Sequence, residues 1–282
     1  MSNSILKVPD QNPQEIVALF SQQEAYAKLG KYKDEIWDVY QKVFIAALTT
    51  GETVLAKKCW NRLNDRFHKS PRVEGLYGMF LEATASEKDA MSYYNSKLSE
   101  DPTHTVIYKR KLALLRSMGQ TKECIQGLIN YLDTFYNDLE AWAELADIYV
   151  SVEAFESAIF CYEEMVLLQP FEPRLFARLG DLYFVLAQSN ATNYWFSLKH
   201  YCRSVEICEE YFHGWFGISK CCQQLLELSR TELKRLLSKV NEKISDTFPD
   251  TESVRQLYQL SLKKSDLFAQ KQPKLKALLE QC

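Results

Sequence analysis

Residues 138–170, DLEAWAELADIYVSVEAFESAIFCYEEMVLLQP, contain two successive amphipathic patterns separated by a short turn. In the first pattern the apolar landmarks from Trp142 to Tyr149 follow the i, i+3, i+4, i+7 spacing of one helical face. In the second pattern, from Ala158 to Met165, they follow i, i+4, i+7. We therefore expect an antiparallel pair of helices, which cannot bury both of its apolar faces without a neighbour.

The same landmarks return at a period of 34 residues on both sides of this pair. Earlier units place them at Tyr40, Val43, Ala47, Ala56, Trp60 and Leu63, then at Gly78, Leu81, Ala90 and Tyr94, then at Tyr108, Leu112, Leu115, Cys124, Leu128 and Tyr131. Later units begin at Phe176 and Trp215, which are 39 residues apart. The five extra residues predict an insertion near 187–193, inside the fifth unit.

This repeated signature resembles the tetratricopeptide-repeat family, a 34-residue helix pair with an aromatic residue, Leu-Gly/Ala, Tyr, Ala, a second aromatic residue and a closing proline. The resemblance implies an all-α fold, a right-handed superhelical solenoid of tetratricopeptide-type helix pairs. The small share of Gly and Pro, nine and eight residues, also argues against a fold rich in strand turns. We expect the landmark aromatics, Trp142 among them, to be buried between successive pairs.

The repeat pattern divides the chain into three parts. Residues 1–36 form an N-terminal segment with a lead-in helix, and residues 37–245 hold about six repeat units, the last with a second helix over 231–245. Residues 246–282 form C-terminal helices, of which the last spans 274–279. Terminal units of a solenoid must cover an otherwise exposed core, so we expect both flanks to act as caps.

Composition and charge exclude several classes of function. A net charge of −3 and a pI of about 5.9 give no basic footprint for nucleic acid. Polar residues interrupt the longest chargeless stretch, 182–198, so it fails as a transmembrane helix. The first 13 residues lack the apolar core of a signal peptide. The eight cysteines are predicted to be reduced, buried thiols of a cytosolic protein.

The sequence lacks the motifs of common catalytic and metal sites. It has no Gly-rich phosphate loop, no HExxH and no GxSxG. The segment from His200 to Cys202 and the Cys221–Cys222 pair do not match the paired spacing of structural zinc sites. Asn190-Ala-Thr192 matches a glycosylation sequon, which is expected to be unused in a cytosolic protein. We expect no catalytic residue, cofactor, metal or small-molecule substrate.

A solenoid instead offers a groove lined by the exposed face of each first helix. The side chains predicted for this partner-binding groove are Lys109, Arg110, Arg116, Glu144, Asp147, Arg174, Arg178 and Asp181. Nearer the N-terminus the same face carries Ile45, Leu48, Leu76 and Met79, so we expect an apolar strip there. Apolar residues beside mixed charges are typical of a protein-binding surface.

One alternative is a co-chaperone that binds the peptide tails of heat-shock chaperones. Members of that tetratricopeptide subclass hold a C-terminal carboxylate with basic residues and asparagines. Lys109, Arg174 and Arg178 occupy the basic positions, but Ala113 and Glu144 stand where the asparagines belong. The acidic side chains nearby disfavour a bound carboxylate.

The middle of the chain resembles a more specific family, the second subunits of the ER membrane protein complex. The resemblance extends over most of residues 30–230. It rests on Tyr108-Lys-Arg-Lys111, Asn130-Tyr-Leu132, Glu140-Ala-Trp142, Glu144-Leu-Ala146, and Phe160-Cys161 with Glu163-Glu164.

The resemblance implies a non-catalytic scaffold on the cytoplasmic face of the endoplasmic reticulum, attached to the membrane through partners rather than by a span of its own. Its partners would be integral and soluble subunits of a complex that inserts transmembrane segments, including those of tail-anchored proteins, without nucleotide hydrolysis.

Overall fold

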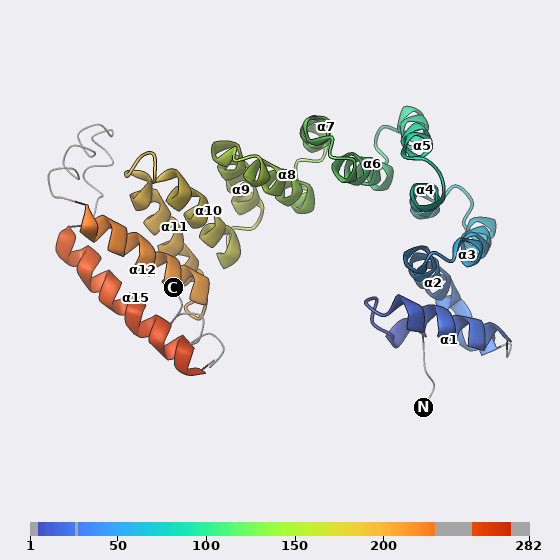
Figure 1. Ribbon diagram of the computed structural model, residues 1–282, viewed down its shortest axis with the longest axis horizontal. Helices are drawn as coiled ribbons and strands as arrows, with labels where there is room; N and C mark the ends of the chain where they lie inside the picture. Colours follow the sequence, from blue (N-terminus) through green and yellow to red (C-terminus); the bar gives the residue numbers. More distant parts are fainter. Residues whose placement is uncertain (1–4, 26–27, 229–249, 272–282) are drawn as a thin grey trace. The chain divides into compact units, whose positions relative to one another are not determined.

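The computed structural model describes residues 5–25, 28–228 and 250–271, and within these ranges every regular element is helical. The chain folds into two compact units, residues 1–127 and 128–282, whose boundary falls inside helix α7. Figure 1 shows the helices of each unit following one another in sequence order. The all-α expectation is confirmed, and the fold is a solenoid of helical repeats.

The first unit begins with short helices and continues as successive helix pairs. Its elements are η1 (Ile5–Lys7), α1 (Pro13–Ala25), η2 (Lys28–Glu35), α2 (Ile36–Thr50), α3 (Thr53–Arg66), α4 (Pro71–Thr84), α5 (Glu87–Glu100), α6 (Thr105–Ser117) and the start of α7 (Thr121–Thr134). Val39, Val43 and Phe44 of α2 are fully buried at the centre of its core.

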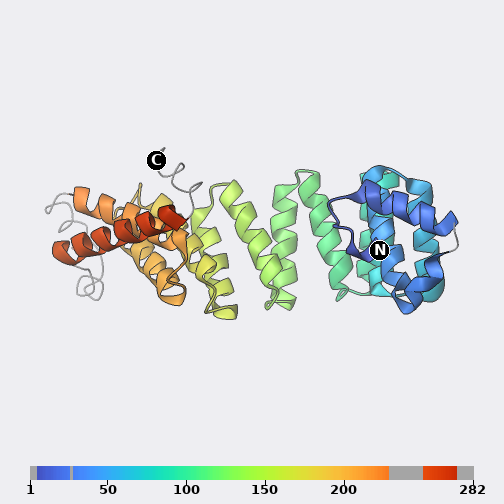
Figure 2. The same cartoon turned by 90° about the horizontal axis from the view of Figure 1, so that it is seen from below.

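The second unit contains the helix pair predicted over residues 138–170. Its elements after α7 are α8 (Leu139–Ser151), α9 (Phe155–Leu168), α10 (Pro173–Leu186), α11 (Asn193–Ile207), α12 (Phe212–Glu227) and α15 (Thr251–Lys271). A longer connection, residues 187–192, joins α10 to α11. The helices predicted over 231–245 and 274–279 lie outside the described residues. Within the described part, α15 packs along α12, and α11 also contacts α12. The pairing of α12 and α15 can be followed in Figure 1 and Figure 2.

Local sequence signals explain where these helices begin and end. Ser86 and Asp89 form a capping box at the start of α5. Asp138 caps α8 by accepting a hydrogen bond from the backbone N–H of Ala141 at 3.2 Å. Gly51 and Gly119 adopt left-handed backbone angles, with φ of 80° and 70°, directly after α2 and near the end of α6. These residues hold the connections short, so each helix returns beside the one before it.

In each of two helix pairs, a small residue on the first helix lets a large ring of the second helix approach the backbone closely. A Cβ atom added to Gly78 would lie 2.3 Å from the ring of Tyr94, and one added to Gly180 would lie 2.8 Å from the ring of Tyr201. The two glycines are three repeat periods apart, and each packs against the tyrosine of its own pair. The 34-residue period therefore reflects a repeated steric fit between helices.

The tryptophans at the fourth helical position also repeat one specific contact. Trp142 donates its Nε1–H to the carbonyl of Tyr136 at 2.8 Å, and Trp215 donates to the carbonyl of Glu209 at 2.7 Å. Trp215 is buried, with 6% of its surface exposed, whereas Trp142 is only half-buried. The expectation that Trp142 is buried is wrong, because the α9 ring beside it, Phe160 at 6.1 Å between centroids, is itself 55% exposed and does not cover the indole.

The apolar strip expected near the N-terminus is mostly core. Leu76 is buried, and Leu48 and Met79 pack against the core of the first unit. The N-terminal segment folds onto α2, where Lys42 Nζ donates to the carbonyl of Val8 at 2.6 Å. Only Ile45 keeps a substantial exposed surface, so the strip is wrong as a binding surface.

Within the described ranges, none of the helices combines the length and the apolar character that a bilayer crossing requires.

Candidate partner-binding site

Three residues of the predicted groove, Lys109, Arg110 and Arg116, lie on α6 in the first unit. The guanidinium of Arg110 forms an ion pair with the carboxylate of Glu82 on α4, and the hydroxyl of Tyr94 donates to the same carboxylate. Arg110 thus joins α4 to α6 and leaves about a third of its side chain exposed. Arg116 is exposed and Lys109 is half-buried.

The other five predicted residues lie in the second unit, on α8 and α10. Arg174 and Arg178 are one helical turn apart on α10, and 75% and 66% of their side chains are exposed. Arg174 pairs with Glu172 at 2.8 Å and Arg178 with Asp181 at 3.6 Å. Ion pairs this exposed contribute little to folding, so both guanidinium groups are accessible to a partner.

Asp181 is held by several donors and has a structural role. It accepts a hydrogen bond from the hydroxyl of Tyr201 at 2.6 Å, and the Nε2 atom of His213 lies 2.8 Å and 3.0 Å from its two oxygens. Burial and the Asp181 carboxylate raise the pKa of Tyr201, which keeps its hydroxyl protonated as a donor. Asp181 therefore links α10, α11 and α12 and also orients Arg178.

On α8, Asp147 is exposed and Glu144 is half-buried. The eight predicted residues thus divide between the two units, three on α6 and five on α8 and α10. Within the second unit, α10 carries the two most accessible cations of the set. A groove built from all eight residues stays a prediction.

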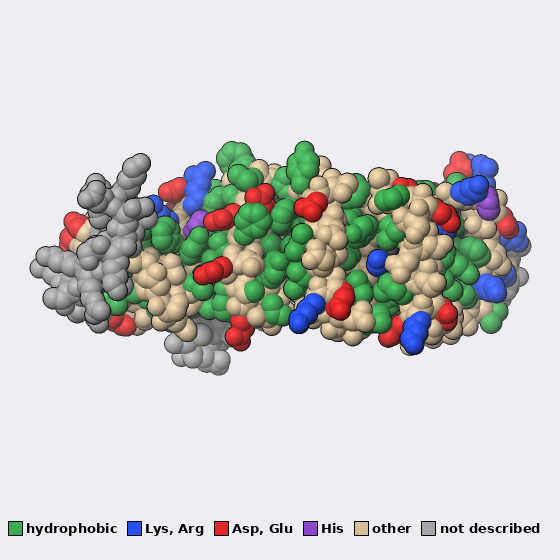
Figure 3. Space-filling view, turned by 90° about the horizontal axis from the view of Figure 1, so that it is seen from above, with side chains coloured by type: hydrophobic (Ala, Val, Ile, Leu, Met, Phe, Trp, Pro, Cys, Tyr) green, Lys and Arg blue, Asp and Glu red, His purple; other side chains and the backbone are tan. Residues whose placement is uncertain are grey.

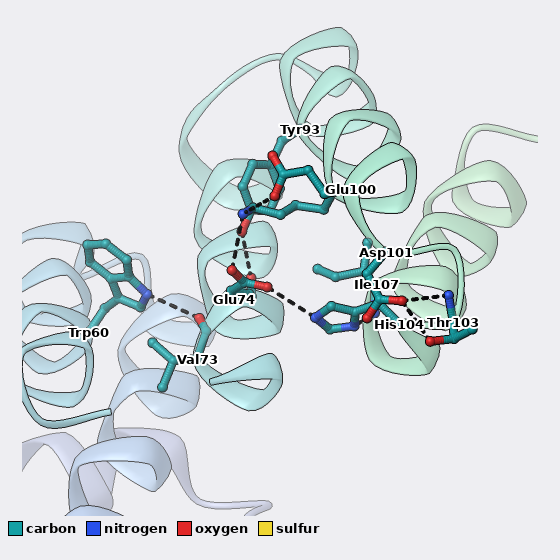
Figure 4. A network of polar contacts seen from close by, with 10 residues as sticks. Trp60, Val73, Glu74, Tyr93, Glu100, Asp101, Thr103, His104 and Ile107 are labelled. Atoms are coloured by element: carbon teal, nitrogen blue, oxygen red, sulfur yellow. Dashed lines mark hydrogen bonds and ion pairs between the residues drawn. The ribbon is translucent and has the colours of Figure 1, made fainter. Parts of the chain in front are cut away.

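A polar centre that the sequence reasoning missed lies in the first unit, around Glu74 (Figure 4). Its carboxylate pairs with Lys97 Nζ at 3.1 Å and with His104 Nε2 at 3.2 Å. His104 Nδ1 accepts the N–H of Ile107 at the start of α6, which places the ring proton on Nε2. Glu74 therefore joins α4, α5 and α6. A histidine immediately before a predicted helix was the available signal, although its partner lies 30 residues away.

The described cysteines are free thiols in apolar surroundings. Burial raises the pKa of Cys59, Cys161, Cys221 and Cys222 to about 12, so these thiols stay protonated and unreactive at neutral pH. Over the described ranges, no three His, Cys, Asp or Glu side chains gather as a metal site would require.

Comparison with known proteins places these features in a family. Residues 60–199 match a family model described as the EMC2 TPR-like repeat domain. ER membrane protein complex subunit 2-A of Xenopus laevis is 33% identical over 195 residues, which cover 69% of this chain and 64% of the relative. The matched region is thus slightly under two thirds of that relative's length. ER membrane protein complex subunit 2 of Saccharomyces cerevisiae is 24% identical over 258 residues, 82% of this chain and 88% of the relative.

A solved structure supports the fold independently. The C-terminal part of a TPR repeat-containing protein from Cytophaga hutchinsonii superposes with a TM-score of 0.52 at 13% identity, covering 86% of this chain and 100% of the other. At this identity the likeness concerns the fold alone. The chain belongs to the tetratricopeptide-repeat family, and in its sequence it resembles subunit 2 of the ER membrane protein complex.

Proposed function

We propose that the chain is a non-catalytic scaffold subunit of the ER membrane protein complex. It holds integral and soluble subunits together while the complex inserts transmembrane segments, including those of tail-anchored proteins, without nucleotide hydrolysis. The observation that carries this proposal is the match of residues 60–199 to the EMC2 TPR-like repeat domain. The relatives' names supply the complex, and the solenoid supplies an extended surface for several partners.

The proposed location is the cytoplasmic face of the endoplasmic reticulum, where the chain is a peripheral protein. It would reach the membrane through its partners, because none of the described helices can span a bilayer. The proposed contacts with those partners use the first-helix face of the second unit.

Arg174 and Arg178 test this surface. Replacing both with Glu removes two exposed cations from α10 and places carboxylates beside Glu172 and Asp181. We expect the variant to fold, with a thermal midpoint within a few degrees of the unaltered chain, because exposed pairs are worth about 0–1 kcal/mol. Its recovery of at least one partner subunit should fall markedly, since like charges then face each other in the contact. Recovery is measured by quantitative mass spectrometry of the tagged chain purified from mildly solubilised membranes.

A matched control is available in the same unit. Arg203 and Arg255 are also exposed arginines in i, i+3 pairs with a glutamate, but they lie on α11 and α15. Replacing both with Glu makes the same change of charge away from the first-helix face of α10. Equal partner recovery by the two double variants would contradict the proposed surface. Recovery of Hsp70 or Hsp90 in place of ER subunits would favour the co-chaperone alternative.

A further inference from the structure

A groove of about 750 Å³ lies between α7 and α9, the second helices of two successive pairs, with α8 as its floor. All of its lining residues belong to the second unit. Its edges carry large exposed rings, since Tyr136 is 71% exposed and Phe160 is 55% exposed. The indole of Trp142 lies between them, 6.1 Å from the ring of Phe160. Exposed aromatic side chains around a cavity of this size are typical of a binding site.

The groove exists because α9 is small where its counterpart in the next pair is large. Ser157 and Cys161 of α9 line the cavity. At the same repeat positions α11 carries Phe196 and His200, whose rings pack on Tyr183 at centroid distances of 5.6 Å and 5.2 Å. On α8 the residue equivalent to Tyr183 is Tyr149, which no such rings cover. The cavity is thus space beside Tyr149 that two rings occupy in the next pair.

The charged residues that line the groove are all acidic. Asp133, Glu156 and Glu164 line it, and no Lys or Arg occurs between Lys122 and Arg174, a stretch that contains eleven Asp and Glu residues. In the space-filling view, hydrophobic and acidic side chains lie beside one another over α8 and α9 (Figure 3). An occupant that buries apolar groups here must also place its cations against these carboxylates.

The chain itself shows how a cation fits such a tryptophan. Trp215 occupies the repeat position of Trp142, and Lys264 of α15 lies over its ring with Nζ 5.7 Å from the centroid. The same ammonium forms an ion pair with Glu209. Trp142 lies among carboxylates as well, but its own pair has no lysine on α9 to cover it. The missing element at the groove is therefore a basic side chain.

We propose that this groove binds an amphipathic helix of a partner chain, with bulky apolar anchors on one face and Lys or Arg along the flanks. The groove walls are helices, which offer no free strand edge for an extended peptide, so a helix lying between α7 and α9 is the mode that fits. This binding requires no other subunit, so the inference does not depend on whether the chain is part of a complex at the ER membrane.

A defined peptide tests the proposal with the full-length purified chain. The probe is a fluorescein-labelled helix of about four turns with Leu at i, i+3, i+4 and i+7 and Lys elsewhere. Two comparison peptides replace every Lys with Glu or place two prolines at the centre. Fluorescence anisotropy should show binding of the Lys peptide that weakens as salt rises. Binding of the other two should be weaker by at least about tenfold, which corresponds to about 1.4 kcal/mol.

Two variants locate the binding. Ser157→Phe introduces the ring that α11 carries at the equivalent position and fills the groove without changing the charge. Asp133→Lys with Glu164→Lys reverses the charge of two groove residues late in their helices, where cations are tolerated. Each should weaken binding of the Lys peptide by at least about tenfold while circular dichroism shows an intact fold. The charge variant keeps the test decisive should Ser157→Phe fail to fold.

The control is Glu153→Lys with Glu227→Lys, which makes the same change of net charge at two exposed residues of the second unit outside the groove. It should bind the Lys peptide within about twofold of the unaltered chain. Equal losses in both charge variants would mean diffuse attraction and would overturn the proposal, as would full binding by folded Ser157→Phe. A chain that sediments as a dimer, and as a monomer with Ser157→Phe, would assign the groove to a second copy instead.

Discussion

Tyrosine hydroxyls connect neighbouring helices by donating to carboxylates. Tyr94 donates to Glu82, Tyr131 donates to Asp138 at 2.8 Å, and Tyr201 donates to Asp181 at 2.6 Å. Burial is the main cause that raises the pKa of each tyrosine, and the neighbouring carboxylate raises it further. The hydroxyls therefore remain protonated donors at physiological pH, and the ring bodies fill the space between helices.

His200 is the residue whose protonation should limit stability in acid. Its ring stacks on Tyr183 at 5.2 Å with an interplanar angle of 6°, and burial lowers its pKa to about 4. In the unfolded chain the pKa returns to about 6.5, so protons favour the unfolded state. The stabilisation is complete above pH 6.5 and is lost as the pH falls towards 4. Between pH 7.5 and 5 we expect His200 to account for a loss of about 2 kcal/mol in the free energy of unfolding.

Comparison with His200→Phe isolates this effect, because phenylalanine keeps an aromatic ring and cannot be protonated. The free energies of unfolding of the two proteins, measured by urea titration, should diverge by about 2 kcal/mol as the pH is lowered from 7.5 to 5. Parallel losses in both proteins would show that His200 is already hydrated and titrates normally in the folded state.

At the scale of the element, the helices begin where side chains satisfy free backbone donors. Asp138 is the most connected of these caps, since one carboxylate oxygen accepts the Ala141 N–H and the other accepts the hydroxyl of Tyr131. One side chain thus starts α8 and fixes it against α7. Asp138 therefore determines both where α8 begins and how α8 packs against α7.

Asp138→Ala should destabilise the chain by about 1–3 kcal/mol, because it removes a helix cap and leaves the Tyr131 hydroxyl without this acceptor. Asp138→Asn keeps an acceptor for the cap and should retain most of the stability. The measurement is the urea midpoint of each variant. A midpoint for Asp138→Ala equal to that of the unaltered chain would mean that α8 starts without help from this side chain.

At the scale of the whole molecule, the structure agrees with the predictions from the sequence wherever the repeat pattern is regular. Gly78 and Gly180 with their tyrosines could be predicted, because a small residue opposite a ring recurs at the period of the helix pair. The half-exposed Trp142 could not be predicted from its own landmark position. The cause lies on α9, where Ser157 and Cys161 stand in place of the rings that α11 carries at the equivalent positions, so only a comparison between these two pairs would have revealed it.

The candidate site was predictable only in part for the same reason. Arg174 and Arg178 are exposed on α10, as their helical positions indicated. Arg110 shares the repeat position of Arg178, two periods earlier, but is held by Glu82, which precedes it by 28 residues on another helix. Helical periodicity places a side chain on a face, but it does not identify the partner that a neighbouring helix brings to that face.

The proposed role of this solenoid is that of a subunit of a membrane-protein complex rather than of a free adaptor. The most direct measurement is the stoichiometry of the chains that co-purify with the tagged protein from mildly solubilised ER membranes, determined by quantitative mass spectrometry. We expect several integral ER proteins in amounts about equal to the tagged chain, retained without added nucleotide. A chain recovered alone, or only with soluble heat-shock chaperones, would contradict it.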